Sequence, residues 1–153
     1  LTQCYDHAVN AKNRWQAAQF CSAQGARLCT EAEWERAANG PGPDKRLHPW
    51  GNEDFASNLV NIPSVGTGYV EPVHWFEDGQ SVEGVLNLAG NVYEWVYDEY
   101  GLYEDADGAV LDNPRNSPES ATDEVIGRGS CFFTEPEHTV TDRSTFAMTF
   151  DWG

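Results

Sequence analysis

The spacing of apolar and polar residues predicts a helix from Asn13 to Gln24. Trp15, Ala18 and Cys21 recur at helical spacing and, with Phe20, share one face, which we expect to be buried. Asn13 has a side chain that can cap the first turn, and a glycine follows the last periodic residue. A short amphipathic helix therefore opens the ordered part of the chain.

A second helix is marked at both of its ends. Thr30 and Glu33 form a capping box, in which each side chain can bond the backbone N–H of the other residue. Trp34, Ala37 and Ala38 supply its apolar side, and a glycine at position 40 lies just beyond its end. The pattern predicts a helix that begins after Thr30.

The remainder of the chain has no helical period. Residues 50–82 alternate short apolar runs with turn residues, and Ala89-Gly90-Asn91 marks a tight turn. Strands are expected near Val125–Phe133 and Ser144–Phe150. Two early helices followed by short strands and long loops predict an irregular α+β domain, and residues 1–153 are the length of a single domain.

Between Asp98 and Glu124 the chain becomes strongly polar. This stretch carries nine acidic residues and one basic residue, Arg115, together with two X-Pro steps. Charge blocks of this kind are typical of solvated segments. We expect a long surface loop here, and loops on a rigid scaffold are frequent binding sites.

Charge narrows the range of possible partners. The chain has nine basic and 25 acidic side chains, which give a formal net charge of −16. A surface this acidic repels phosphate backbones and anionic lipid. We therefore expect no nucleic-acid partner. No run of about eighteen apolar residues occurs, so no membrane-spanning helix is expected either.

The cysteines and tryptophans suggest further features. Cys4, Cys21, Cys29 and Cys131 lack C-x-x-C spacing, which argues against a zinc ribbon or a thioredoxin-type site. Their number suits an exported protein with one or two disulfides, although four reduced thiols in the cytosol are the alternative. The six tryptophans are spread along the chain and are expected to fill its core.

Four motifs in one order carry a family resemblance: GARLCTEAEWERAA at 25–38, PWGN at 49–52, NLAGNVYEW at 87–95 and Gly129-Ser130. Their order and spacing resemble the formylglycine-generating-enzyme, or sulfatase-modifying-factor, family. The resemblance implies a C-type-lectin-like fold. It also implies that the family's N-terminal strands would precede Leu1 and that its final strand would begin at Gly153.

Enzymes of the family that this chain resembles oxidise a sulfatase cysteine with a pair of copper(I)-binding cysteines, and the resemblance implies where those cysteines would lie. The matching positions here are Phe133 and His138, so both thiolate ligands are absent. Cys131 lies two residues before the first of these positions. A displaced site built on Cys131 would need a second cysteine nearby. We therefore expect a catalytically degenerate member that is not an enzyme.

The resemblance also implies a structural calcium ion. Its ligands in the family match the side chains of Asn87 and Glu94 and the backbone carbonyl groups of Gly90 and Val92. A hard cation prefers such oxygen ligands. The alternative is that Asn87 and Glu94 only bond the backbone of their own turn.

Three functions remain open. The first is a non-catalytic binding or structural module that contacts a protein partner, a larger assembly or a ligand through its loops. The second is a formylglycine-generating oxidase with a displaced site. The third is a ligand-binding variable protein of the retroelement-diversified kind, which shares the fold and would vary near 129–153. We expect the first, in an exported bacterial protein of the periplasm or the extracellular space.

Overall fold

The computed structural model describes residues 6–43, 45–101, 124–137 and 139–147. The described chain forms two helices, one short 3-10 turn and three strands. In chain order these are α1 (Arg14–Ala23), α2 (Glu31–Asn39), η1 (Glu77–Gly79), β1 (Glu94–Glu99), β2 (Glu124–Arg128) and β3 (Ser144–Ala147). The architecture confirms the predicted α+β class.

Both helices begin at the residues that the sequence predicts. Asn13 caps α1: its side-chain oxygen accepts from the backbone N–H of Gln16, and its own backbone N–H donates to Oε1 of Gln16. Thr30 caps α2 in the same way with Glu33. A capping box satisfies N–H groups that have no partner inside the helix, so it fixes the start of the helix locally.

The strands form one antiparallel sheet in the order β1-β2-β3. Glu94 pairs with Arg128, and Glu99 pairs with Val125, with an irregularity between these two pairs. β2 ends at Arg128, earlier than predicted, because Gly129 and Ser130 turn to left-handed φ values of 87° and 64°. That turn directs the chain away from the sheet.

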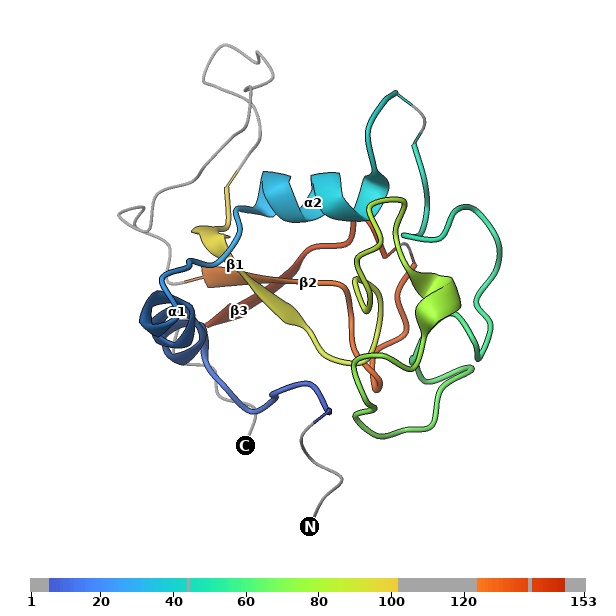
Figure 1. Cartoon of the computed structure of the whole chain (residues 1–153), viewed down its shortest axis with the longest axis horizontal. Coiled ribbons are helices and arrows are strands. Elements are labelled where there is room, and N and C mark those ends of the chain that lie inside the picture. Colours follow the sequence, from blue (N-terminus) through green and yellow to red (C-terminus); the bar gives the residue numbers. More distant parts are fainter. Residues whose placement is uncertain (1–5, 44, 102–123, 138, 148–153) are drawn as a thin grey trace.

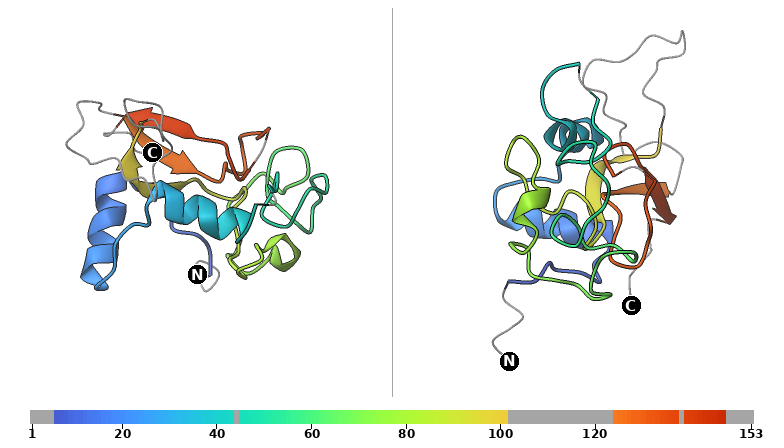
Figure 2. Two further views of the ribbon diagram at one scale, coloured as in Figure 1. Left: turned by 90° about the horizontal axis from the view of Figure 1, so that it is seen from above. Right: turned by 90° about the vertical axis from the view of Figure 1, so that its right-hand side faces the viewer.

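The core lies between α2 and the sheet. Figure 1 shows α2 running across one side of the strands, and Figure 2 shows the same layer from above. Trp34 and Ala38 of α2 pack with Val96 of β1 and Ile126 of β2, and all four are buried. This contact is the small hydrophobic core that the motif around Trp34 predicts.

The segment between α2 and β1 is irregular and has its own cluster. Val60, Ile62 and Ala89 are buried together, with Trp50 and Phe55 packed against them. Figure 1 shows this segment as loops beside the sheet, on the side away from α1. The cluster holds the turn before β1 in place.

The expected burial of apolar residues is wrong at several positions. α1 has no buried residue, and Trp15 and Phe20 are 65% and 68% exposed. Trp75 is 56% exposed, whereas Trp34 is buried. Arg14 ties α1 to β1, because its guanidinium donates to the carbonyl oxygens of Val96 and Tyr97.

Candidate functional site

The turn before β1, at residues 87–91, contacts two segments that are distant in the sequence. Asn87, Gly90 and Asn91 have left-handed φ values of 58°, 67° and 63°. A side-chain carbon at Gly90 would lie 2.4 Å from the carbonyl oxygen of Asn61, so only glycine fits there. The N–H of Gly90 donates to the carbonyl oxygen of Gly129 at 2.6 Å. The backbone of the predicted calcium turn is therefore fixed by its neighbours.

Asn87 offers an oxygen without a hydrogen bond. Its Nδ2 donates to the carbonyl oxygen of Val73. Its Oδ1 is buried and has no hydrogen-bond partner among the described residues. Leaving such a group unsatisfied costs about 1–3 kcal/mol. A cation bound by Oδ1 would remove that cost.

Glu94 closes the same stretch as the first residue of β1. Its carboxylate accepts a hydrogen bond from Nε1 of Trp34 at 2.5 Å. Burial raises the pKa of Glu94 to about 7, and the Trp34 bond opposes that rise. The charged form of Glu94 is thus disfavoured by burial, and a nearby cation would favour it.

The predicted calcium ligands lie on one continuous stretch, 87–94. The described residues include no group of three or more His, Cys, Asp or Glu that could hold a metal ion. A cation at this turn would therefore depend on amide and carbonyl oxygens together with Glu94. These are oxygen donors, as calcium requires.

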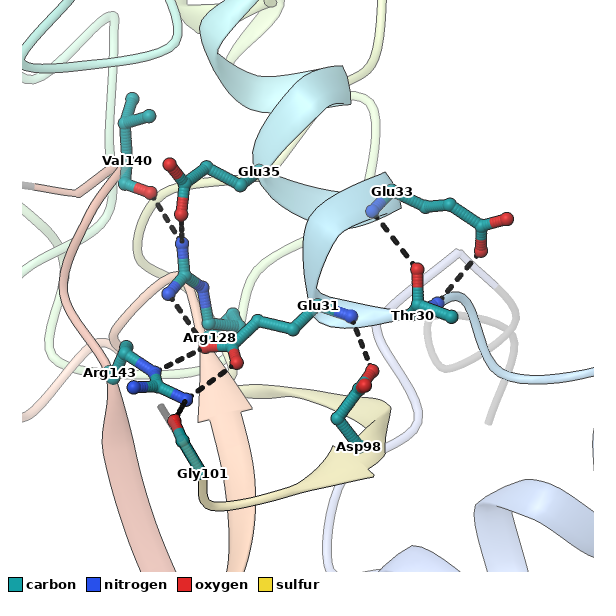
Figure 3. Close-up of polar contacts among 9 residues, drawn as sticks. All are labelled: Thr30, Glu31, Glu33, Glu35, Asp98, Gly101, Arg128, Val140 and Arg143. Carbon is teal, nitrogen blue, oxygen red and sulfur yellow. Dashed lines mark hydrogen bonds and ion pairs between the residues drawn. The ribbon is translucent and has the colours of Figure 1, made fainter. Parts of the chain in front are cut away.

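A buried ion-pair network lies between α2 and the sheet (Figure 3). Arg128 is fully buried and donates to Glu31 at 3.0 Å, to Glu35 at 3.0 Å and to the carbonyl oxygen of Val140 at 2.6 Å. Arg143 of the loop before β3 donates twice to Glu31, at 2.7 and 2.8 Å. One buried carboxylate thus serves two guanidinium groups.

The same network corrects the expectation for the acidic segment. Asp98 and Glu99 belong to β1 and are buried, so they are not part of an exposed loop. Asp98 accepts from the backbone N–H of Glu31 at 2.7 Å, at the start of α2. Residues 102–123, with most of the acidic side chains, lie outside the described residues.

A cavity of about 870 Å³ opens between α1 and the start of β1. Four segments and Leu28 line it, the segments being residues 9–12, the α1 positions Gln16, Ala17, Phe20 and Cys21, residues 91–95, and residues 131–133. Val92 and Glu94 of the calcium stretch form part of its wall, whereas Asn87 and Gly90 do not. The sequence gives no sign of this cavity, because its walls come from distant parts of the chain.

The structure brings two thiols to this cavity. Cys21 and Cys131 both line it, although the sequence separates them widely. The Sγ of Cys131 donates to Oγ1 of Thr134 at 3.3 Å. Cys21, Cys29 and Cys131 are free thiols, so the expected disulfides are wrong for these three. Burial raises the pKa of Cys29 to about 11, with the charge of Glu94 as a smaller cause.

Phe133 lies in the wall of the same cavity. It is 50% exposed and packs edge-on against Phe132, with ring centroids 4.9 Å apart. The resemblance places the first copper-binding cysteine at this position. The second position, His138, lies outside the described residues.

The fold and these motifs define a sulfatase-modifying-factor domain. Residues 3–149 match the Sulfatase-modifying factor enzyme 1-like domain, and the chain belongs to that family. It is 34% identical over 137 residues to the formylglycine-generating enzyme of Bos taurus, covering 82% of this chain and 35% of the relative. It is 32% identical over 141 residues to the inactive C-alpha-formylglycine-generating enzyme 2 of Bos taurus, covering 72% and 46%. The chain spans less than half the length of both relatives.

A solved structure supports the fold independently. Treponema denticola variable protein 1 superposes with a TM-score of 0.70 and 19% identity, covering 95% of this chain and 68% of that one. At that identity the likeness shows the fold alone. Among the described residues, no helix is long and apolar enough to cross a membrane.

Proposed function

We propose that this domain is a non-catalytic binding module of the formylglycine-generating-enzyme family. Phe133 carries the proposal, because it occupies the position where the resemblance places the first copper-binding cysteine. A phenyl ring cannot replace the thiolate that a soft copper(I) ion prefers. Sequence identity does not distinguish an active from an inactive member here, since the relative named as an enzyme and the relative named as inactive are 34% and 32% identical to this chain.

The test is a direct assay of the oxidation. The protein is incubated with a cysteine-containing sulfatase peptide, copper and a reductant, and the peptide is followed by mass spectrometry. Bovine formylglycine-generating enzyme is the positive control. We expect no aldehyde above a blank without protein, and conversion above that blank would contradict the proposal.

One observation favours an oxidase as the second candidate. Cys21 and Cys131 line one cavity, so a displaced site would draw on these two thiols. If that pair were catalytic, replacing either cysteine with serine would abolish any conversion found in the assay. Conversion that survives both substitutions would exclude this displaced site.

We also propose that calcium binds at residues 87–94. The side-chain oxygens of Asn87 and Glu94 and the carbonyl oxygens of Gly90 and Val92 would hold it. The unpartnered Oδ1 of Asn87 supports this assignment. A ligand that binds only the folded state stabilises it by about 2.7 kcal/mol at a concentration of 100 Kd. Calcium should therefore raise the Tm relative to EDTA.

The control for calcium separates the ligand from surface charge. Glu94→Ala should abolish the calcium-dependent rise in Tm, whereas Glu83→Ala, which removes an exposed carboxylate, should leave it unchanged. A Tm that is the same in calcium and in EDTA would contradict calcium binding.

Finally, we propose an exported bacterial protein that contacts a basic partner through the acidic segment. The net charge of −16 supports a basic partner. Neutralising Glu104, Asp105 and Asp107 together should weaken association and its salt dependence while leaving the Tm nearly unchanged. Asp98 and Glu99 are unsuitable for this test, because both are buried. Association that does not weaken with salt would count against this surface.

A further inference from the structure

Hydrogen bonds between distant segments hold the walls of the cavity beside α1 in place. Nε1 of Trp95 donates to the carbonyl oxygen of Lys12 at 2.7 Å, which ties the first wall segment to β1. The N–H of Phe132 donates to the carbonyl oxygen of Asn91 at 3.1 Å, which joins two further segments. Arg14 fixes α1 to β1 through the carbonyl oxygen of Val96 at 3.0 Å. A preformed cavity is the usual form of a small-molecule site.

The lining is mainly apolar and rich in aromatic rings. Five rings contribute to it: Phe20, Tyr93, Trp95, Phe132 and Phe133. Phe20 and Phe133 remain 68% and 50% exposed, and Val9 at the edge is 78% exposed. Apolar side chains gathered in a hollow of the surface mark a binding site more often than a scattered set does.

The size of the cavity favours a small molecule. Its volume of about 870 Å³ falls within the range of about 300–1,000 Å³ that is usual for organic ligands. A partner protein generally needs a contact surface of about 1,000 Å² or more, well beyond such a hollow.

Charge selects the kind of molecule. A protein with a net charge of −16 repels anions. Lys12 lines the cavity, and its ammonium group, which donates to the carbonyl oxygen of Ala11 at 3.2 Å, disfavours cations there. The carboxylate of Glu94 accepts the bond from Trp34 and is a proposed calcium ligand, so it is not assigned to a ligand in the cavity. An uncharged ligand meets neither repulsion.

We propose that this cavity binds an uncharged aromatic organic molecule, which stacks on the rings of its wall. This proposal rests on the proposed function of a non-catalytic binding module. It names the ligand of that module, at the place where the resemblance puts the copper-binding cysteines. Aromatic contacts in offset or edge-on geometry would supply affinity beyond simple burial.

The probe for the test is N-phenyl-1-naphthylamine, which is uncharged and fluoresces strongly in apolar surroundings. We expect saturable binding of one molecule per chain. Ala17→Trp should fill the cavity and weaken binding by about tenfold or more, and Phe133→Ala should weaken it by about three- to tenfold. Trp75→Ala is the matched control, because Trp75 is 56% exposed but does not line the cavity. The anionic probe 1-anilinonaphthalene-8-sulfonate should bind more weakly.

Circular dichroism and the Tm establish that each variant is folded, and Phe133→Ala keeps the test available if Ala17→Trp does not fold. Binding that fails to saturate, or that Trp75→Ala weakens as much as Phe133→Ala, overturns the proposal. If the probe does not bind and the sulfatase peptide stays unconverted, the proposed ligand is wrong and the non-catalytic function is kept. Conversion of the peptide together with saturable probe binding overturns that function and leaves the cavity assignment standing.

Discussion

Replacing Glu31 with alanine removes the one carboxylate that both Arg128 and Arg143 contact. The side chain of Glu31 is 2% exposed and that of Arg128 is 0% exposed, so water cannot replace the lost partner. Three hydrogen bonds of 2.7–3.0 Å disappear together. Breaking a buried pair by removing one partner costs about 3–5 kcal/mol, because the charge of Arg128 stays buried with Glu35 as its remaining carboxylate.

That loss is large against the total stability of such a domain. The free energy of unfolding of a domain is typically about 5–15 kcal/mol. A change of 1 kcal/mol moves the Tm by about 2–4 °C at this length, so Glu31→Ala should lower the Tm by about 6–20 °C. Urea unfolding followed by circular dichroism gives the free energy, and a thermal scan gives the Tm.

The matched control is the exposed pair of Arg36 and Glu83. Its N···O distance is 2.8 Å, but the side chains are 53% and 42% exposed. Exposed pairs contribute about 0–1 kcal/mol, so Glu83→Ala should change the stability little. If Glu31→Ala and Glu83→Ala cost the same small amount, burial does not govern the strength of these pairs and the reasoning fails.

Three further predictions concern local structure. Thr30→Ala should lower the free energy of unfolding by about 0.5–2 kcal/mol in urea melts, because the cap of α2 is lost. The hydrogen bonds from Arg27 and from the backbone N–H of Thr30 lower the pKa of Glu33 from 4.5 to about 2. The depressed pKa means that Glu33 stabilises the fold above about pH 4.5 and loses that effect as the pH falls towards 2. The stability difference between the wild type and Glu33→Gln should therefore shrink over this range. Gly90→Ala should cost about 1–3 kcal/mol, because its Cβ would meet Asn61 and its φ is left-handed. A thermal scan that shows no loss would contradict this.

The helices could be predicted because their signals are local. Asn13 and Thr30 each form a capping box with a residue three positions later, so a short stretch of sequence contains the whole interaction. The left-handed turn at Gly90 is likewise visible in the motif around it. Such features depend on the neighbouring residues and little on the rest of the fold.

Long-range features could not be predicted in this way. Arg128 and Glu31 are 97 positions apart, and neither residue type signals burial by itself. Trp15 has the spacing of a buried face with Ala18 and Cys21, yet it is 65% exposed in the fold. Spacing predicts which residues share a face, but only the fold decides whether anything covers that face.

The buried network also helps to position the wall of the cavity at residues 131–133. Arg128 is fixed by three partners, and Gly129 directly after it accepts the hydrogen bond from Gly90. The chain then reaches Phe132, whose N–H bonds the carbonyl oxygen of Asn91. These contacts use backbone atoms beyond Arg128, so they do not depend on the side chain at position 133. Phe133, at the position where the resemblance places a cysteine, therefore lies on a backbone that other residues hold.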